Sequence, residues 1–474
     1  MNFEAIINAV TYGVGKVNDV MSYILVVVLI IGGVYFTLST KCVQFRRFKQ
    51  QLKYIMEKPT DGKGVSSFQA LIVSTASRVG TGNIIGVSTA ICLGGYGSVF
   101  WMWLIAIIGS ASAFAESTLA QIYKKKGKDG CYGGPAYYIE AALKSRPLAV
   151  VFTIFLMLTY GFGFNMLASY NLQSTFSSYS FYNEQYTPWI IGLILAVLVG
   201  YCMMGGGKRI IKVTEFLVPF MGIIYIGVAI VVVIINYKVI PGIMSKIFED
   251  AFDFKAIFGG ISGSCMMYGI KRGLFSNEAG VGSAPNASAA AEVSHPAKQG
   301  LVQVLSVFID TLLVCSATAF LCLCSGIEPT AAISGAPYVQ QSMGETLGAF
   351  GPVFLTVAMI LFAFTTLLGN LYYVDKSYNY LLRREPSKKF MNIAHIISAV
   401  IVFIGAGLNA DLLWGIADIT MGGMTLINIP VILVLSKYVS RTLNDYDIQL
   451  KSGKNPTFVS KSIGIKNDLD YWKQ

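Results

Sequence analysis

Charged residues are scarce in this chain. Lysine, arginine, aspartate and glutamate make up 13% of its 474 residues, whereas soluble globular proteins carry about 25%. Hydrophobic residues make up 54%. The longest uncharged runs cover residues 79–115, 147–183 and 346–374, and a membrane-spanning helix needs only about 20 apolar residues. The shortage of charge therefore argues against a soluble domain and predicts an all-α polytopic membrane protein.

The chain also has few of the side chains that common catalytic sites need. It has two histidines, His295 and His395, and its eight cysteines form no paired C-x-x-C spacing of the kind that binds zinc. No Ser-His-Asp set is recognisable, and the phosphate-loop pattern G-x-x-x-x-G-K-[ST] does not occur. We therefore expect no enzyme, no cofactor and no ATP-driven pump.

The apolar runs predict about eleven transmembrane helices. They are expected near residues 20–40, 66–93, 98–122, 148–178, 187–205, 212–236, 255–292 with an interruption, 299–325, 350–378, 391–409 and 412–436. Residues 1–19 are expected to form a short polar lead, and residues 439–474 a polar cytoplasmic tail.

The lysines and arginines predict the orientation in the membrane. They cluster at residues 41–63, 124–128, 208–212, 376–389 and 437–473, while the alternate loops at 94–98, 179–187 and 326–349 contain none. Basic loops stay on the cytoplasmic side. The net charge of +11 therefore indicates no nucleic-acid partner. It predicts a multi-pass protein of the plasma membrane with its N-terminus outside and its C-terminus in the cytoplasm.

The segment "RVGTGNIIG", residues 78–86, interrupts a long apolar region with an arginine and three glycines. A dinucleotide loop would need G-x-G-x-x-G, but the spacing here is G-x-G-x-x-x-G. Two interpretations remain open: a small-residue packing seam, and a helix that unwinds at Gly80 and Gly82 to bind a ligand. The second interpretation expects alanine at Gly82 to crowd the ligand and to penalise a positive φ.

A second interrupted segment begins five helices later. Residues 259–285 are rich in glycine and serine and contain Lys271, Arg272 and Glu278. Two broken helices at corresponding positions indicate a transporter built from inverted repeats, with its binding site between them. We expect an extra helix and a basic loop at 1–63, five-helix repeats at 64–236 and 237–438, and the tail at 439–474.

Long motifs in this order give the chain a family resemblance. They are "VGTGNIIGVSTAICLGGYGSVFWMW" (79–103), "FAESTLAQIYK" (114–124), "GGPAYYIE" (133–140), "RGLFSNEAGVGSAPNASAAA" (272–291), "HPAKQGLVQ" (295–303), "VFIDTLLVCSATA" (307–319) and "FAFTTLLGNLYY" (362–373). The chain resembles the alanine or glycine:cation symporter family, the sodium:alanine symporters, which share the five-plus-five inverted-repeat fold of the leucine transporters.

The resemblance implies a small neutral amino acid as cargo and Na⁺, or in some members H⁺, as the coupling ion. It assigns a substrate site to Thr81, Gly82, Asn83, Ala168, Cys265, Tyr268, Gly269, Thr366 and Asn370. It assigns the Na⁺ site to the carbonyls of Ala76 and Val79 and to the hydroxyls of Thr365 and Thr366. Na⁺ is a hard cation that takes oxygen ligands. Threonines also commonly bond back to their own helix, so the pair has a purely structural interpretation as well.

Two positions depart from the family pattern. Residues 167–170 read "LASY" where members often have glutamine in a "VQAN" run, and Asn370 stands where many have tryptophan. The resemblance favours alanine or glycine as cargo, and these two departures make a larger amino acid such as glutamine a candidate as well.

Buried charges are costly in a membrane and are usually paired. Arg78, Glu116, Arg272 and Glu278 are predicted to form gating or structural pairs, with Asp310 as a further buried acid. Alanine or glycine symport, by a monomer that alternates its access, is the leading hypothesis. An amino-acid sensor or a channel of similar fold is the alternative, although no filter motif or output domain supports it.

Overall fold

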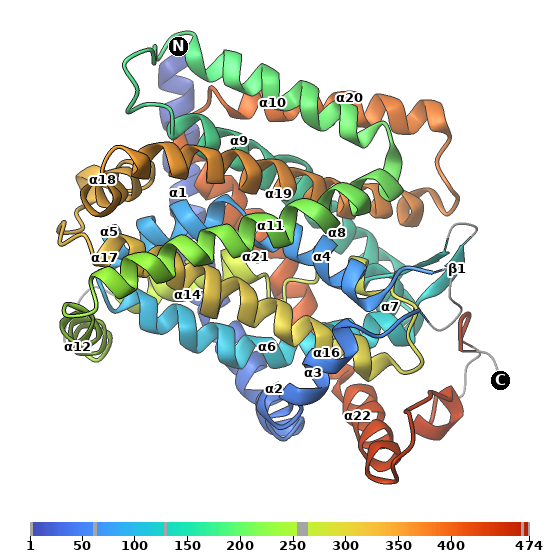
Figure 1. The fold of residues 1–474 in the computed structure, drawn as a ribbon. Coiled ribbons are helices and arrows are strands. Elements are labelled where there is room, and N and C mark those ends of the chain that lie inside the picture. Colours follow the sequence, from blue (N-terminus) through green and yellow to red (C-terminus); the bar gives the residue numbers. More distant parts are fainter. Residues whose placement is uncertain (1–2, 60–63, 128–129, 254–263, 466–468, 473–474) are drawn as a thin grey trace.

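The protein is a bundle of long helices with one small hairpin at one end (Figure 1). The computed structural model describes residues 3–59, 64–127, 130–253, 264–465 and 469–472. Within these ranges the strands β1 (Lys125–Gly127) and β2 (Gly130–Tyr132) pair antiparallel, with Lys126 opposite Cys131. The prediction of an all-α membrane protein is confirmed.

The first half of the chain runs from the extra helix to the long helix α11. Its elements are α1 (Phe3–Ser39), α2 (Val43–Arg46), α3 (Phe48–Ile55), α4 (Ser67–Arg78), the π-helical turn η1 (Gly82–Gly86), α5 (Val87–Gly94), α6 (Ser98–Ile122), α7 (Pro135–Leu143), α8 (Arg146–Met157), η2 (Leu158–Gly163), α9 (Phe164–Ser174), α10 (Thr187–Met203) and α11 (Gly206–Ile235).

The second half contains the other broken helix and the cytoplasmic tail of the prediction. Its elements are α12 (Ile240–Ala251), α14 (Cys265–Asn277), α15 (Pro285–Ser288), α16 (Pro296–Val307), η4 (Phe308–Cys315), α17 (Ser316–Leu323), η5 (Ala331–Ile333), α18 (Ala336–Leu347), α19 (Phe350–Leu382), α20 (Lys388–Gly405), α21 (Ala410–Val434), α22 (Ser436–Lys451) and η6 (Ser460–Ile463). Residues 255–263 of the predicted interrupted helix lie outside the described residues.

Eight helices in the described ranges are long and apolar enough to cross a bilayer by themselves. The segments Gly82–Gly94 and Thr187–Met203 are apolar but shorter. The count of eleven transmembrane helices therefore stays a prediction: of the other three predicted spans, those at 66–93 and 255–292 are interrupted, and Thr187–Met203 is short.

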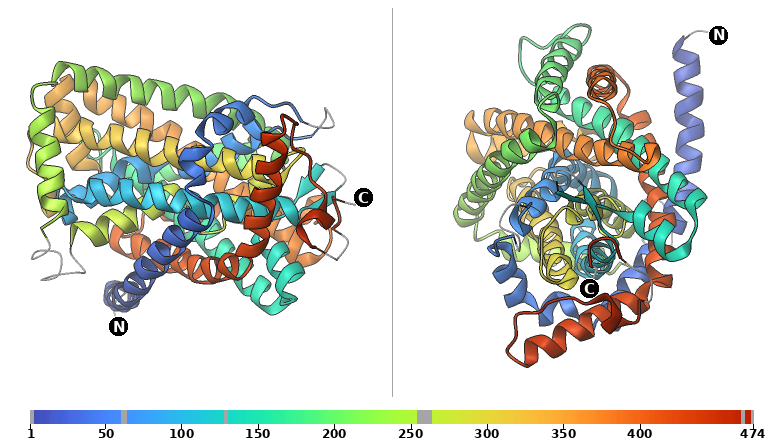
Figure 2. Two further views of the ribbon diagram at one scale, coloured as in Figure 1. Left: turned by 90° about the horizontal axis from the view of Figure 1, so that it is seen from below. Right: turned by 90° about the vertical axis from the view of Figure 1, so that its right-hand side faces the viewer.

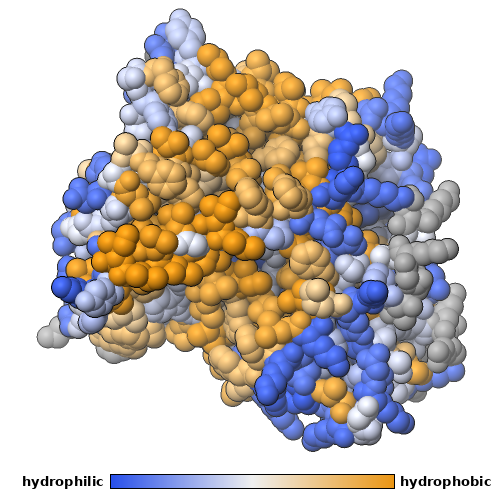
Figure 3. Space-filling view, viewed as in Figure 1, coloured by the Kyte–Doolittle hydropathy of each residue, from blue (hydrophilic) through white to orange (hydrophobic). Residues whose placement is uncertain are grey.

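The hydrophobic surface forms a broad band across the middle of the molecule (Figure 3). Hydrophilic residues gather beyond it at the end that carries the hairpin, α7 and α22, which we call the basic end (Figures 1 and 3). The helices α12 and α18 lie at the opposite end (Figure 1). This division matches the division of basic loops in the sequence.

The two broken helices lie at the centre of the bundle and contact each other. Gly94 of α5 packs against Tyr268 of α14, and Gly82 of η1 packs against Phe275 of α14. The helices α6 and α16 flank them, and α10 pairs with α20 at one edge (Figures 1 and 2). Helix geometry thus places both interruptions deep inside protein, where unpaired backbone is tolerated.

The prediction that residues 1–19 form a polar lead is wrong. Helix α1 begins at Phe3 and continues without interruption to Ser39. Val14 contacts the backbone of α21 at Gly415, and Met21 contacts it at Gly422. Packing against α21 stabilises the first turns of α1 as helix, and the polar composition of this segment does not reveal that packing.

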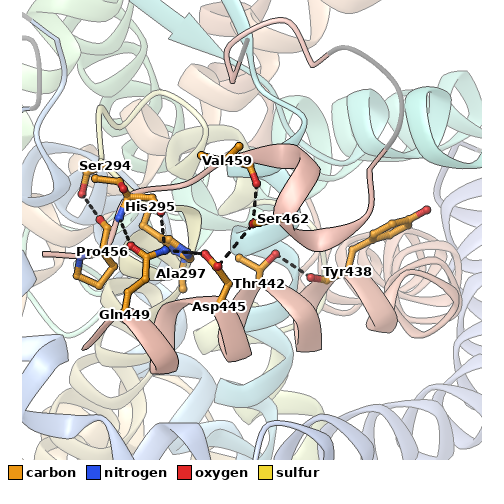
Figure 4. Close-up of polar contacts among 11 residues, drawn as sticks. Ser294, His295, Ala297, Tyr438, Thr442, Asp445, Gln449, Pro456, Val459 and Ser462 are labelled. Carbon is orange, nitrogen blue, oxygen red and sulfur yellow. Dashed lines mark hydrogen bonds and ion pairs between the residues drawn. The ribbon is translucent and has the colours of Figure 1, made fainter. Parts of the chain in front are cut away.

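The predicted polar tail is also more ordered than its composition suggests. In α22, Asp445 contacts His295 at 3.2 Å, and the amide of Gln449 donates to the same carboxylate at 2.8 Å (Figure 4). Ser294 donates to the carbonyl of Pro456 at 2.7 Å. The tail therefore packs against the segment that follows the second broken helix.

Aromatic and ionic contacts fix α22 on α2 and α3. The hydroxyls of Tyr54 and Tyr446 lie 2.7 Å apart, and burial raises the pKa of both, so both stay protonated at neutral pH. Asp447 accepts from Arg46 and Arg47, each at 2.6 Å. Helix α22 is thus an integral part of the basic end.

Candidate functional site

The first broken helix opens between Arg78 and Gly82. Helix α4 ends at Arg78, and the chain becomes helical again in the π-turn η1. The side-chain oxygen of Asn83 accepts from the backbone N–H of Gly80 at 2.7 Å, which satisfies one donor freed by the break. The break predicted from the glycines is therefore present at this position.

Gly80 is needed because α19 passes very close to the break. A Cβ on Gly80 would lie 2.0 Å from the hydroxyl oxygen of Thr366. One turn further along α19, a Cβ on Gly369 would lie 2.6 Å from the backbone nitrogen of Ser77. Two glycines thus bring the end of α4 and the hydroxyl of Thr366 together.

The two threonines proposed as cation ligands differ in orientation. Thr365 donates to the carbonyl of Leu361 at 2.9 Å and lies 3.5 Å from the sulfur of Met221, on the α11 side of its helix. The hydroxyl of Thr366 is buried and has no hydrogen-bond partner within the described residues. An oxygen without a partner, beside the last turn of α4 with Ala76 and the unwound residue Val79, is suited to a cation.

On its other side the break faces aromatic rings. The ring of Phe275 lies against Gly82, where a Cβ would be 2.8 Å from two ring carbons. Phe275 packs on Phe164 at 4.4 Å and on Trp414 at 4.8 Å between ring centroids. The sequence analysis missed these three rings because they come from α14, α9 and α21.

Polar side chains line the break beneath these rings. Ser77 donates to the side-chain oxygen of Asn370 at 2.7 Å, and Asn370 donates to Asn165 at 2.9 Å. Thr81 accepts from the amide of Asn171 at 3.2 Å. Ala168 is buried on α9, one turn beyond Phe164. The structure therefore brings Thr81, Gly82, Thr366 and Asn370 to the break.

Asn83 reaches a buried acid rather than the aromatic side. Its amide donates to the Asp310 carboxylate at 2.7 Å, and Ser276 and Thr311 each donate to the same carboxylate at 2.8 Å. Asp310 is fully buried in η4. The side chain of Asn83 thus joins the two broken helices to a third helix.

Cys265, Tyr268 and Gly269 lie away from the break. A Cβ on Gly269 would lie 2.4 Å from the carbonyl of Ser98, and Cys265 and Tyr268 pack on Gly94. They belong to the first turns of α14, whereas Phe275 and Ser276 lie near its end. Their assignment to the substrate site stays a prediction, and in this structure they contact α5 and α6 rather than the break.

Arg272 forms its ion pair with a residue that the sequence analysis did not select. Its guanidinium donates to Asp418 of α21 at 2.7 Å, and Lys271 lies 3.3 Å from the same carboxylate. The guanidinium also lies 4.0 Å from the ring of Trp414. This buried pair fixes α14 on α21 directly beside the aromatic rings.

The other predicted charges gather on the opposite side of the break. Arg78 donates to Gln303 at 3.1 Å, and no ion pair of Arg78 with Glu116 or Glu278 occurs within the described ranges. Glu278 accepts from Ser77 at 3.2 Å and from Ser283, and Glu116 accepts from the amide of Asn428 at 2.8 Å. Polar neutral groups therefore supply the side-chain hydrogen bonds of both acids, while the charge of Arg78 acts on both from nearby.

A cavity of about 390 Å³ opens above the break at the end opposite the basic end. Ile85 of η1, Asn171 and Trp414 line it, together with Gly335 and Asp411. Asn171 touches both this cavity and Thr81. An open cavity thus reaches the wall of the break, with the aromatic rings beside it.

These features define a secondary transporter with discontinuous helices rather than an enzyme. Comparison with a known structure agrees with the architecture. The crystal structure of MhsT in complex with L-phenylalanine superposes with a TM-score of 0.54 at 15% identity and covers 86% of this chain and 95% of that one. That likeness shows the fold.

The chain belongs to the sodium:alanine symporter family, whose sequence profile matches residues 7–460. It is 42% identical to the "Probable sodium/glutamine symporter GlnT" of Bacillus subtilis, over 97% of this chain and 95% of that one. It is also 42% identical to the "Amino-acid carrier protein AlsT" of the same organism, over 92% of each. The "Sodium/alanine symporter AgcS" of Methanococcus maripaludis is 35% identical, over 93% of this chain and 99% of its own.

Proposed function

We propose that this protein imports a small neutral amino acid together with Na⁺ by alternating access. The observation that carries the proposal is the break between Arg78 and Gly82, with the unpaired hydroxyl of Thr366 on one side and the ring of Phe275 on the other. Amide N–H groups at the start of the outer half-helix attract a carboxylate, and carbonyls at the end of the inner half-helix attract a cation. The named relatives support the same pairing of ligands.

The Na⁺ site takes the carbonyls of Ala76 and Val79 and the hydroxyl of Thr366. All are oxygen ligands, as a hard cation requires. The hydroxyl of Thr365 donates to carbonyls of its own helix α19, so Thr365 is left out of this site. The substrate carboxylate meets Thr81 and Gly82 on the side of the break that faces Asn171.

The size of the cargo follows from the aromatic wall. The ring of Phe275 leaves little room over Gly82, which favours alanine or glycine. Within the described residues, however, the buried side-chain nitrogen of Asn165 and the buried side-chain oxygen of Asn171 have no hydrogen-bond partner. Since these groups would match a carboxamide, glutamine is the third candidate.

Uptake in proteoliposomes tests the proposal. Purified protein is reconstituted, and radiolabelled alanine, glycine and glutamine are supplied with an inward Na⁺ gradient, with a K⁺ gradient, or with a proton gradient. We expect accumulation with Na⁺ alone and mutual competition among accepted amino acids. Facilitated equilibration without dependence on any gradient would favour a channel, and binding without uptake would favour a sensor.

A further inference from the structure

A cleft of about 600 Å³ opens at the basic end between the hairpin, α7 and the end of α19. Glu140, Arg146, Lys376, Arg383 and Glu385 contribute to its walls. The lining therefore carries both signs of charge, which suits a zwitterion such as an amino acid. The cleft lies at the other end of the bundle from the cavity above the break (Figure 1).

A second and much smaller cavity lies deeper, next to the cleft. Its volume is about 10 Å³, enough for about one water molecule. Thr153, Asn286 and Ser377 line it, and its wall shares Tyr137 and Tyr380 with the cleft. These two rings therefore lie at the boundary between the two spaces.

Tyr137 and Tyr380 are held together from both sides of this boundary. Their ring centroids lie 5.1 Å apart at an interplanar angle of 75°. The hydroxyl of Tyr380 donates to Glu140 of α7 at 2.5 Å, and Arg383 and Arg146 lie 3.5 Å and 3.9 Å from the same carboxylate. Aromatic and ionic contacts thus hold α7 against α19 between the cleft and the small cavity.

A column of polar groups leads from the small cavity to the break. Asn286 donates to the carbonyl of Ser283, Ser283 donates to Glu278, and Ser77 donates to Glu278 from the end of α4. We call Ser77, Glu278, Ser283 and Asn286 the inner column. Two of its four members, Glu278 and Ser283, belong to the unwound stretch between α14 and α15.

Two buried tyrosines accompany the inner column. The rings of Tyr160 and Tyr373 lie 5.3 Å apart, and their buried hydroxyls lie near Ser283 and Ser77 of the inner column. Both rings lie close enough to Glu278 to interact with its charge. A continuous set of buried polar groups at membrane depth indicates a route that water enters in another conformation.

We infer that Tyr137, Tyr380 and Glu140 form the inner gate, and that cargo leaves the break along the inner column into the cleft at the basic end. The inference rests on the proposed transport function and adds to it the exit route and the residues that close it. The small cavity is too narrow for an amino acid, so the gate is closed in this structure. Opening requires the Tyr137 and Tyr380 rings to separate.

Cysteine labelling in nanodiscs tests the gate without any assumption about orientation. The parent protein carries Cys42→Ser and Cys131→Ser, because Cys42 is exposed and Cys131 lines the cleft. Thr153→Cys then reports on the small cavity, and Thr89→Cys reports on the cavity above the break. The reagent is a charged methanethiosulfonate.

We expect Tyr380→Ala to raise the labelling rate of Thr153→Cys by at least about fivefold and to lower that of Thr89→Cys, because one population gains what the other loses. Tyr380→Phe, which keeps the ring but cannot donate to Glu140, should give an intermediate rate. Tyr132→Phe is the matched control, since Tyr132 lines the cleft but not the small cavity, and its rate should stay at the parent value.

Unchanged labelling of Thr153→Cys in the Tyr380→Ala protein would overturn the gate, and so would an equal increase in the Tyr132→Phe protein. Ser377→Cys reports on the same small cavity if Thr153→Cys does not fold. The two proposals fail separately. Loss of Na⁺-driven uptake by the parent would overturn the transport function alone, whereas intact uptake with unchanged labelling would overturn the gate alone.

Discussion

Thr365 and Thr366 show how neighbouring residues of one type take different roles. Successive positions on a helix point in directions about 100° apart, since 3.6 residues make one turn. The hydroxyl of Thr365 therefore bonds back to Leu361 beside α11, while that of Thr366 lies against Gly80 without a partner. The pair looked equivalent in the sequence, and only Thr366 is placed to supply a side-chain oxygen at the break.

Valine at each position separates these roles at nearly constant volume. We expect Thr366→Val to weaken the apparent Na⁺ affinity at least about tenfold, equivalent to about 1.4 kcal/mol. Amino-acid affinity should fall with it, because coupled ligands weaken each other reciprocally. Thr365→Val is the control, and its Na⁺ affinity should stay within about twofold of the parent.

Na⁺ titration of amino-acid uptake measures both variants. Equal losses of Na⁺ affinity in the two variants would mean that the hydroxyl of Thr366 has no special role at the cation site. No loss for Thr366→Val would remove the hydroxyl of Thr366 from the cation site.

The broken helix formed by α4, η1 and α5 combines three glycines with different duties. Gly80 permits the close approach of Thr366, whereas Gly82 permits the approach of Phe275. The expected positive φ at Gly82 is not found, because Gly82 opens a π-helical turn. Gly86 has more space, with its nearest neighbour 3.7 Å from a Cβ. A packing seam would need close contacts at both Gly82 and Gly86, and only Gly82 has one.

Alanine at Gly82 and at Gly86 tests this difference. We expect Gly82→Ala to bind amino acid at least about tenfold more weakly, since its methyl would displace the Phe275 ring. Gly86→Ala should bind normally and gain about 0.5–1 kcal/mol of stability, because its backbone is already right-handed helical at φ −64° and ψ −39°.

Binding by isothermal calorimetry and melting of the purified variants check these outcomes. Normal binding by Gly82→Ala, with equal losses of stability at both positions, would mean that residues 78–86 serve packing and that the amino acid binds elsewhere.

The molecule as a whole is two ends of different composition joined by a hydrophobic band (Figure 3). The basic end carries the cleft, the inner gate and the docked helix α22, and the other end carries the cavity above the break. A site between two such openings is the geometry that alternating access requires. Whether the basic end faces the cytoplasm is a prediction from the positive-inside rule.

Cys42 tests this orientation with no added residue. It is exposed at the basic end, between α1 and α2, and the other seven cysteines are buried. We expect a membrane-impermeant maleimide to label the protein in inside-out vesicles and to leave it unlabelled in intact cells. The parent carries Cys131→Ser, because Cys131 lines the cleft, and adding Cys42→Ser should abolish the signal. Labelling of intact cells at Cys42 would place the basic end outside.

The sequence by itself determined the membrane class, most of the helices, the break after Arg78 and the family resemblance. These depend on composition and on patterns within one segment, such as uncharged runs and glycine spacing, which local physics controls. Residues 1–19 were the exception, because α1 continues through them along α21.

Only the tertiary structure decided which side chains meet. Asp418 lies 146 positions from Arg272, and Asp310 lies 227 positions from Asn83, so no local pattern could pair them. Cys265, Tyr268 and Gly269 share a helix with Phe275, and helix packing, not spacing from a motif, placed Phe275 at the break. Neighbouring helices fix the rotation and depth of each segment, because close packing allows few alternatives once their side chains interlock.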